Sequence, residues 1–578
     1  MAITNKLNVS FRFDKIDETY DIYRITTSDK YIAKGARCLD GLISESKALS
    51  VAFDYGKCAY ALYKKGDADK LAINASLNDP KLSIKQIYSR EMKDYILLRL
   101  FLYSLGNYRS EENLFNNLTG KLFLVNPAWQ KASKKNLIAL QIDVDNELNL
   151  SASVTTFSLA SCFKKLDKSK LAVLPQYVLE MNGKLRRKLT IDEKGDAYIR
   201  KGIPGRKTDI PFLDLSKDKI RQTRAHFIYK ALNDLNKRHG EVLNVEFATI
   251  DIKGAIGTKR DEDFVSTALA AIRNKDIYIK NLISDPLYEE SYIQLKESLE
   301  AHIGKPLIEN KDSKQKHGCN ILFLHDKDFY DGENDPYKEL KKDEVTQCIT
   351  LEDSSNKIIR DSKAVINTII KEIIIKDDIV NRKRITLDDW ASFGFTGNWY
   401  FGMEKDGTKY FMTIHKDGTF EMETRDILSF GKRDVLSELS SRIDDSDLKS
   451  KSIVMDDKGS INLISCTGGY CLPDPEIFSL SVISRSKESR ERYLKGVVDI
   501  NLYEKDGAYF YSAGPVGSGM QASIPKASLI YKIDIVRGDY IIPAILATLS
   551  VMFVKYNSFT VLPYPFKYLR EYVPMKDR

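Results

Sequence analysis

The sequence has few of the features that mark secreted, membrane or metal-binding proteins. Its seven cysteines include no Cys-x-x-Cys pair, which argues against both a disulfide framework and a structural zinc site. The longest apolar run, Ile541 to Val554, is shorter than the roughly 18 residues that cross a bilayer, so it predicts a buried helix. The first residues lack the apolar core and cleavage site of a secretion signal. We therefore expect a cytoplasmic protein without a membrane partner.

An excess of charge of one sign is also nearly absent. The chain has 89 basic and 81 acidic residues, which leaves a formal net charge of +8 over 578 residues. Such a balance excludes a polybasic coat, so a nucleic-acid partner would have to lie in a localised channel. With 43% hydrophobic residues the composition is that of a folded protein, and the length predicts about four domains of roughly 150 residues each.

Hydrophobic periodicity predicts a mixture of α/β and α+β parts. Before residue 311 we expect a strand at 8–13, a helix at 87–105, a hairpin at 137–158 that turns at Asp145-Asn146, helices at 217–237 and 289–302, and a strand at 242–250. A polar run at 311–317 is a predicted linker. After Trp390 the chain becomes strand-rich, with strands expected at 400–402, 410–414, 452–455, 508–511 and 527–535, and a helix at 543–556.

The segment from Asn320 to Lys376 has the clearest pattern. An all-apolar strand at 321–324 precedes Asp335-Pro336, an N-cap residue followed by a first-turn proline, which predicts a short helix at 337–342. A strand follows at 345–351, and a long helix carries an apolar stripe at helical spacing, formed by Val365, Ile366, Ile369, Ile370, Ile373 and Ile374. Strand, helix, strand and helix in this order predict a Rossmann-like layout, in which ligands gather at the carboxyl ends of the strands.

Five polar residues of this segment form a candidate site. Tyr337 and Lys341 are four residues apart on the short helix, and Asn367 and Lys371 are four apart on the polar side of the long helix. Gln347 lies on the strand between the helices. Two ammonium groups with hydrogen-bond donors beside them suit a terminal phosphate. Any one of these residues alone would more often belong to a solvated surface, so the prediction depends on the ordered combination.

The three motifs Tyr337-x-x-x-Lys341, Thr346-Gln347-Cys348 and Asn367-x-x-x-Lys371 together resemble the MID domain of Argonaute proteins. The resemblance implies that Tyr337 stacks on the first, unpaired base of a guide strand and that Lys341, Gln347 and Lys371 hold its 5′ phosphate. Lys376 lies one residue beyond the place of a second family lysine.

The family also implies Mg²⁺ at the guide phosphate, held there by the C-terminal carboxylate. This chain departs from the family by ending in the polar Met575-Lys-Asp-Arg578.

Two later segments are similar to PIWI domains: Gly519 to Tyr531, with Pro525 before a strand, and the close Leu562-Pro-Tyr-Pro-Phe-Lys-Tyr-Leu. The resemblance implies a bilobal Argonaute-like architecture with a Rossmann-like MID domain and a degenerate RNase H-like PIWI domain. The expected domains are an N-like domain with linker strands at 1–160, a linker and reduced PAZ-like region at 161–310, the MID domain at 311–390 and the PIWI-like domain at 391–578.

Active PIWI domains hold two divalent metals with acidic residues, and this set looks incomplete here. The fourth ligand should lie two residues after Pro525, where the chain has Ala527. Glu404, Asp456 and Asp457 are the remaining candidates, and each stands in a sequence typical of turns. We expect no catalytic metal site and no enzyme activity. An active guided endonuclease built on those three acids is one alternative, and an unrelated Rossmann-like protein that binds a phosphorylated metabolite is another.

The partners implied by the resemblance are a short 5′-phosphorylated guide strand, with DNA favoured, and a complementary target DNA. Basic side chains that could line a channel for the duplex are Lys184, Arg186, Arg187, Lys188, Arg382, Lys383 and Arg384. An inactive guide-binding protein needs an effector partner. In its length, its divergent N-terminal half and its degenerate PIWI-like domain, the chain is similar to the Argonaute-like subunit of bacterial plasmid-defence systems (DdmE type). That similarity implies recruitment of a helicase-nuclease.

Overall fold

The computed structural model describes most of the chain in two compact units. Unit 1 contains Met1–Ile250, Leu472–Leu494 and Gln521–Ala527, and unit 2 contains Asp251–Cys471, Lys495–Met520 and Ser528–Arg578. The described residues are 2–28, 36–54, 58–77, 81–107, 114–118, 120–130, 135–163, 174–180, 183–188, 197–200, 210–216, 219–251, 253–255, 269–311, 318–325, 330, 336–338, 340, 344–350, 363–425, 434–444, 452–480, 487–494, 497, 501–512, 523–524, 526–549 and 562–576. Helices combine with parallel and antiparallel sheets, which confirms the expected α/β and α+β multidomain class.

The first sheet of unit 1 is antiparallel, with the strand order β3-β4-β2-β5. Ala59, Ala61 and Tyr63 of β4 point to one face because strand side chains alternate, and that face packs against α2 and α3. The elements are α1 (Phe13–Thr19), β2 (Tyr20–Thr27), α2 (Ala36–Glu45), β3 (Ser50–Asp54), β4 (Cys58–Lys64), α3 (Lys70–Leu77) and β5 (Leu82–Ile87).

The second sheet of unit 1 has the strand order β11-β10-β12-β9-β8-β7-β6 and contains the predicted hairpin. The turn begins at Asp145 as expected but spans residues 145–149, because the Asp145 carboxylate accepts the N–H groups of Glu147 and Asn149, each at 2.9 Å. The strands are β6 (Phe115–Leu118), β7 (Lys121–Val125), β8 (Asn136–Val144), β9 (Leu150–Leu159), β10 (Gln176–Leu179), β11 (Leu185–Arg187) and β12 (Tyr198–Ile199).

Two helices of unit 1 begin later than predicted. Helix α4 (Asp94–Tyr103) does not start at residue 87, because Ile87 still pairs with Ile22 in the first sheet. Helix α6 (Arg224–His239) starts after a short 3-10 turn, in which the Thr223 hydroxyl donates to the carbonyl of Ile220 at 2.7 Å. The remaining elements are β1 (Ala2–Phe11), β13 (Leu213–Asp214), β14 (Leu243–Ile250), the 3-10 helix η12 (Pro475–Phe478), α11 (Lys487–Leu494) and β27 (Ser523–Ile524). The predicted strand at 242–250 is thus confirmed as β14.

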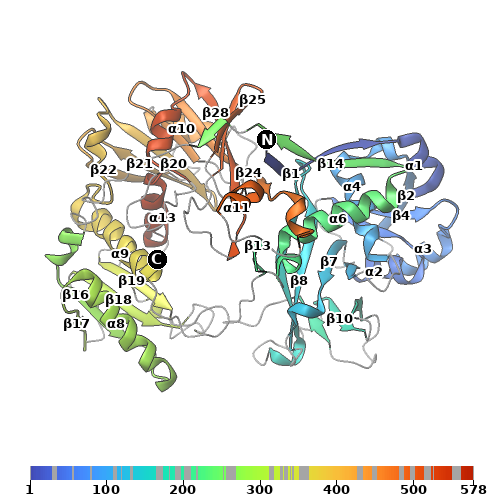
Figure 1. The fold of residues 1–578 in the computed structure, drawn as a ribbon, viewed down its shortest axis with the longest axis horizontal. Helices are drawn as coiled ribbons and strands as arrows, with labels where there is room; N and C mark the ends of the chain where they lie inside the picture. Colours follow the sequence, from blue (N-terminus) through green and yellow to red (C-terminus); the bar gives the residue numbers. More distant parts are fainter. Residues whose placement is uncertain are drawn as a thin grey trace. The chain divides into compact units, whose positions relative to one another are not determined.

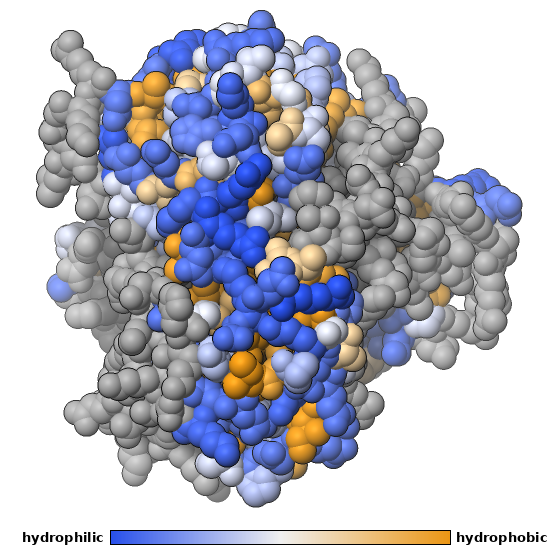
Figure 2. Space-filling view, turned by 90° about the vertical axis from the view of Figure 1, so that its left-hand side faces the viewer, coloured by the Kyte–Doolittle hydropathy of each residue, from blue (hydrophilic) through white to orange (hydrophobic). Residues whose placement is uncertain are grey.

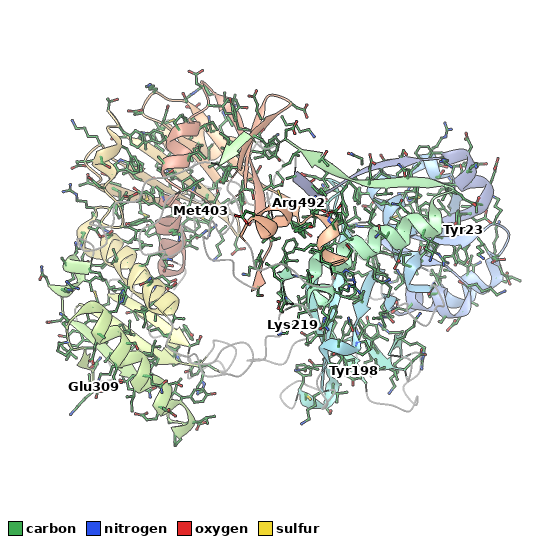
Figure 3. The ribbon with its side chains drawn as sticks, in the orientation of Figure 1. Tyr23, Tyr198, Lys219, Glu309, Met403 and Arg492 are labelled. Carbon is green, nitrogen blue, oxygen red and sulfur yellow. The ribbon has the colours of Figure 1, made fainter. Side chains whose placement is uncertain are left out.

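The first sheet of unit 2 is parallel, with the order β17-β16-β18-β19, which confirms the Rossmann-like layout (Figure 1). The sheet takes β16 and β17 from the chain before residue 311. Glu309 of the edge strand β17, labelled in Figure 3, forms an ion pair with Lys296 of α8 at 2.7 Å. The elements are β16 (Ile277–Asn281), α8 (Glu289–Ile303), β17 (Ile308–Glu309), β18 (Cys319–Leu324), β19 (Val345–Thr350) and α9 (Lys363–Asp377).

The expected helix at 337–342 is only partly described. A 3-10 turn covers Pro336–Lys338, while residues 339 and 341–343 lie outside the described residues. The predicted helix at 289–302 is confirmed as α8, and the predicted long helix with its isoleucine stripe is confirmed as α9.

The second sheet of unit 2 is antiparallel and has the order β15-β25-β26-β28-β24-β23-β20-β21-β22. Hairpin β20–β21 turns at Asp406 and Gly407, whose φ angles of 52° and 84° are left-handed. The strands are β15 (Lys253–Ala255), β20 (Trp399–Lys405), β21 (Thr408–Ile414), β22 (Phe420–Arg425), β23 (Ser452–Met455), β24 (Ile461–Leu472), β25 (Asn501–Lys505), β26 (Ala508–Ser512) and β28 (Leu529–Arg537). Each strand predicted after Trp390 has a counterpart here.

The C-terminal helices of unit 2 join its two sheets. Helix α13 (Pro565–Lys576) lies beside α9 (Figure 1), and its Tyr568 and Leu569 share one hydrophobic core with the isoleucines of α9 and with Phe401 of β20. The predicted helix at 543–556 is described only as α12 (Ile542–Ala547), since residues 550–561 lie outside the described part. Helix α10 (Val435–Asp444) packs on the antiparallel sheet.

The surface and the thiols fit the expectations from composition. Figure 2 shows a mainly hydrophilic face on which apolar residues form small separate groups. Of the helices within the described ranges, none is long and apolar enough to cross a membrane. Cys58, Cys162, Cys319, Cys348, Cys466 and Cys471 are free thiols.

Candidate phosphate-binding site

Helix α9 brings polar side chains into the interior of unit 2. Its isoleucines face the parallel sheet and α13, while Lys371 and Glu372 are half-buried and Lys376 is only 8% exposed. Buried lysines are rare unless they are paired, so this part of the helix must meet acceptors. After Asp377 the helix widens into a π-helical turn, Asp378–Arg382, a feature that is frequent at functional sites.

Gln347 of β19 meets α9 directly. It points to the same side as Val345 and Ile349, which is the side covered by α9. Its carbonyl oxygen Oε1 accepts a hydrogen bond from Lys376 Nζ at 2.6 Å, and its Nε2 donates to Glu372 Oε2 at 2.7 Å. The amide is therefore held between a cation and an anion of the same helix.

Lys376 connects three elements. Besides Gln347, its ammonium group donates to the carbonyl of Thr346 at 3.1 Å and lies 3.4 Å from Glu571 Oε2 of α13. Three acceptors match the three N–H bonds of an ammonium group. In this arrangement Lys376 orients Gln347 and ties α13 to α9, so it acts as a positioning residue.

A second lysine pair forms where α13 faces α9. Lys567 contacts the side chain of Lys371, and burial together with the charges of Lys371 and Arg570 lowers the pKa of Lys567 to about 7. Two ammonium groups side by side repel each other, so one of them loses its proton easily. A lysine pair of this kind is typical of an anion-binding site, because the charge of the anion offsets the repulsion between the two ammonium groups.

Two carboxylates balance part of this positive charge. Burial, and then the charge of Glu571, raises the pKa of Glu372, while Lys376 and Lys371 oppose the shift. Lys371, Lys376, Lys567 and Arg570 against Glu372 and Glu571 leave two positive charges when all six are ionised. This surplus equals the charge of a phosphate monoester dianion.

The buried carboxylate of Asp378, which directly follows α9, holds α13 against α9 through a hydrogen bond. Asp378 Oδ2 accepts hydrogen bonds from the Tyr568 hydroxyl and the Thr386 N–H, each at 2.8 Å, and Oδ1 accepts from the Thr386 hydroxyl at 2.7 Å. Burial raises the pKa of Asp378 to about 7 against these bonds. Lys567 directly precedes Tyr568 in α13, so the hydrogen bond between Tyr568 and Asp378 helps to fix the position of Lys567.

The structure does not bring all predicted site residues together. Tyr337 packs against Leu322, Leu324 and Leu340 on the opposite face of the parallel sheet from Gln347, and its hydroxyl donates to the His325 carbonyl at 3.2 Å. Its stacking role stays a prediction. Lys341 lies outside the described residues.

Asn367 lies one turn before Lys371 on α9 and is only 9% exposed. Its role at a phosphate stays a prediction. Gln347, Lys371 and Lys376 are the predicted residues that the structure gathers at one place.

The acids considered for nuclease chemistry occupy turns. Glu404 is exposed beside the β20–β21 turn. Asp456 Oδ1 accepts the N–H groups of Ser460 and Lys458 at 2.6 and 3.0 Å, and Asp457 Oδ2 accepts the Thr396 N–H and hydroxyl at 2.7 Å each. Among the residues that the structure describes, no group of three histidine, cysteine or acidic side chains could hold a metal ion.

Some basic residues considered for a channel have structural partners. Arg187 is 9% exposed and pairs with Asp40 at 3.3 Å, and Arg186 pairs with Glu180 at 3.2 Å. Arg382 pairs with Asp377 at 2.7 Å. A channel role for these arginines would require them to leave those carboxylates.

Comparisons with known proteins reveal similarity only in structure. No family model and no curated protein matches the sequence. The crystal structure of A. aeolicus Argonaute aligns with 99% of this chain and 97% of its own, at 10% identity and a TM-score of 0.38. The crystal structure of Drosophila Piwi aligns with 98% and 96%, at 12% identity and a TM-score of 0.37. At these TM-scores and identities the two structures do not show what the site binds, so its chemistry is argued from the residues of this chain.

Sequence inspection missed four of the seven residues of the cluster. Glu372, Lys567, Arg570 and Glu571 were not among the predicted site residues. The available signal was the pair Lys567 and Arg570, three residues apart behind Pro565, a first-turn proline that begins a helix. Their spacing indicates one helical face, but only tertiary packing reveals that this face meets Lys371 and Glu372.

Proposed function

We propose that this chain is a catalytically inactive, prokaryotic Argonaute-like protein that holds a short 5′-phosphorylated guide strand between α9 and α13. The guide would pair with complementary target DNA, and base pairing would supply the sequence specificity. Recruitment of a helicase-nuclease would then direct the response against plasmids or other invading DNA in the cytoplasm.

The contact between Lys371 and Lys567 carries this proposal. Two charged lysines packed together are unfavourable, and the repulsion is relieved either when one loses its proton or when an anion lies between them. Lys371, Lys567 and Arg570 would supply the N–H donors to phosphate oxygens, while Gln347 and Lys376 hold each other and their acceptors in place. When all six charged groups are ionised, the surplus charge is that of the ligand. The order of the MID-like motifs favours a nucleic-acid end over a free phosphorylated metabolite.

Catalytic inactivity is supported by the residues available. Ala527 has no group that binds a metal. The Asp456 carboxylate accepts N–H groups of its own turn, and the Asp457 carboxylate accepts those of Thr396 and Gly397. Two closely spaced divalent ions need several carboxylates to offset their charge. The effector is proposed because guide and target binding alone would leave foreign DNA intact.

The donors of the site also fit a Mg²⁺ ion at the guide phosphate. Mg²⁺ is usually held by one or two carboxylates together with phosphate oxygens. Glu372 and Glu571 are near enough for the charge of Glu571 to help raise the pKa of Glu372, as expected for two carboxylates that share a site. When bound, the ion would neutralise charge, and these two residues would hold it.

Replacing Glu372 by glutamine distinguishes two effects of this carboxylate: repulsion of the phosphate and binding of Mg²⁺. In EDTA we expect Glu372→Gln to bind a 5′-phosphorylated strand several-fold more tightly than the wild type, on the order of 1 kcal/mol, because one repelling carboxylate is gone. With Mg²⁺ present, the wild type should gain affinity and the variant should gain little. Fluorescence anisotropy with a labelled oligonucleotide measures both. Glu421→Gln, an exposed glutamate of β22, is the matched control. Weaker binding by Glu372→Gln in EDTA would contradict the arrangement.

The whole proposal is tested on protein purified from cells. Mass spectrometry and sequencing of co-purified nucleic acid should identify short strands with a 5′ phosphate. The loaded protein should bind labelled complementary DNA and leave it uncut in Mg²⁺ or Mn²⁺. The absence of any such strand would favour a phosphorylated metabolite, whereas cutting within the paired region that is lost in Asp457→Ala would show an active endonuclease.

A further inference from the structure

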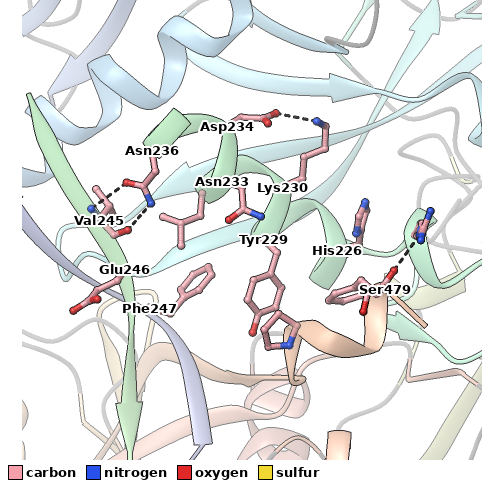
Figure 4. A pocket seen from close by; sticks show the side chains of 14 residues that line it. His226, Tyr229, Lys230, Asn233, Asp234, Asn236, Val245, Glu246, Phe247 and Ser479 are labelled. Carbon is pink, nitrogen blue, oxygen red and sulfur yellow. Dashed lines mark hydrogen bonds and ion pairs between the residues drawn. The ribbon is translucent and has the colours of Figure 1, made fainter. Parts of the chain in front are cut away.

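A second candidate site lies in unit 1, in a groove between α6, β14 and η12 (Figure 4). The groove has a volume of about 900 Å³. Its apolar side is aromatic: the ring of Tyr229 lies 5.1 Å from that of Phe247 and 5.7 Å from that of Phe478, measured between centroids. The Tyr229 hydroxyl is already bonded to the carbonyl of Pro473 at 2.7 Å, so the tyrosine presents its ring to the groove.

The strand that borders this groove has an open edge. Among the described strands, β14 pairs only with β1. Leu7 of β1 stands opposite Phe247, yet its N–H donates away from β14, to the carbonyl of Leu148 at 2.9 Å. Leu7 and Phe247 are therefore a non-hydrogen-bonded antiparallel pair, in which the N–H and C=O of both residues point outward. The backbone groups of Phe247 face the groove side, and by the period of two so do those of Thr249.

Asn236 of α6 shows how this edge accepts a partner. Its side-chain Nδ2 donates to the carbonyl of Val245 at 2.7 Å, and its Oδ1 accepts the Val245 N–H at 3.2 Å. Asn236 thus occupies the two outward backbone groups of Val245 as a neighbouring strand would (Figure 4). Two residues along, Phe247 has no hydrogen-bond partner within the part of the chain that the structure describes. The outward N–H and C=O of Phe247 can therefore form hydrogen bonds with a further strand.

The other end of the groove is positively charged. Burial, followed by the charges of Lys230 and Arg221, lowers the pKa of His226 to about 4, so its imidazole is neutral at physiological pH. The His226 ring lies 5.2 Å from that of Phe478. Lys230 is paired with Asp234 at 2.9 Å, while Arg221 is exposed and bonds only a carbonyl, that of Phe478, at 3.0 Å. A carboxylate beside Arg221 would meet a charge that has no acidic partner among the described residues.

We infer that this groove docks an extended segment of a partner protein, which adds as a strand to the open edge of β14. The backbone of the segment bonds Phe247 and Thr249, a large apolar or aromatic side chain packs against Tyr229, Phe247 and Phe478, and an acidic side chain pairs with Arg221. Strand addition obtains affinity from main-chain hydrogen bonds and specificity from pockets for alternate side chains. Exposed strand edges are also the usual places where another chain can pair. The inference does not depend on the guide-binding proposal.

Random peptides displayed on phage, selected on the full-length protein, supply the probe. The enriched peptides should combine acidic and aromatic residues, and synthetic copies should bind the wild type in fluorescence anisotropy. Arg221→Glu should weaken them about tenfold or more through charge reversal. Arg90→Glu, an exposed arginine of unit 1 outside the groove, is the matched control and should leave binding unchanged.

Two further measurements test the strand geometry itself. Thr249→Pro removes an outward N–H without touching the bonds to β1, and proline is tolerated on strand edges, so it should weaken binding while the melting temperature is kept. N-methylation along the peptide should abolish binding at every second residue, because only alternate amides face β14. Indifference of the enriched peptides to Arg221→Glu, loss of binding without a period of two, or failure to enrich any peptide would each overturn the inference.

Discussion

Replacing Lys371 by alanine should weaken binding of a 5′-phosphorylated guide strand by about 1.5–3 kcal/mol, or roughly 10- to 150-fold, the range for a lost charge-assisted hydrogen bond. The loss should be large because Lys371 is half-buried and stands against Lys567, where a phosphate oxygen would separate the two. Titration of a labelled oligonucleotide, followed by fluorescence anisotropy, gives the two dissociation constants.

The same strand with a 5′ hydroxyl is the ligand control. Its affinity should change much less, because the rest of the strand is bound elsewhere. Lys416→Ala, in an exposed turn of the same unit, is the protein control and should resemble the wild type. Lys341→Ala, predicted from sequence alone, should act in the same direction as Lys371→Ala. Equal losses for phosphorylated and hydroxylated strands would rule out this site as the phosphate pocket.

Binding of the phosphorylated guide should also fall as the pH rises above 7. The pKa of Lys567 is lowered to about 7 in the free protein, so this residue is increasingly neutral at higher pH. A bound dianion favours the charged form and raises that pKa, so binding takes up a proton. The affinity should therefore decrease by up to about tenfold per pH unit between roughly pH 7.5 and 9, where the phosphate itself stays dianionic.

Two substitutions at Lys567 check the origin of this slope. Lys567→Arg keeps its charge throughout the range, so its affinity should be nearly independent of pH. Lys567→Met should bind weakly and also without a slope, because the lysine whose pKa lies near neutrality is gone. Asp378, the other group with a pKa of about 7, keeps its hydrogen bonds to Thr386 and Tyr568. Isothermal titration calorimetry in buffers of different ionisation enthalpy counts the protons directly. A slope that persists in Lys567→Met would assign the proton to another group.

Local patterns predicted strands β18 and β19 of the parallel sheet and helix α9, but not the cluster between α9 and α13. The stripe from Val365 to Ile374 repeats at helical spacing, and the strand of Ile321 is continuously apolar, so both could be predicted from neighbouring residues. Errors occurred where tertiary pairing competes with local spacing: Ile87 was assigned to a helix, yet it bonds in a strand opposite Ile22.

The sequence alone predicted many of the helices and strands and the βα layout of residues 320–376. It proposed Gln347 and Lys371 as members of one site, to which the family resemblance added Lys376. Only the folded chain decided that α13 supplies Lys567, Arg570 and Glu571 to this site and that Tyr337 packs on the other face of the sheet. The reason is range: periodicity depends on residues within a few positions, whereas Lys371 and Lys567 meet because Asp378 and Tyr568 join two helices that are far apart in the chain.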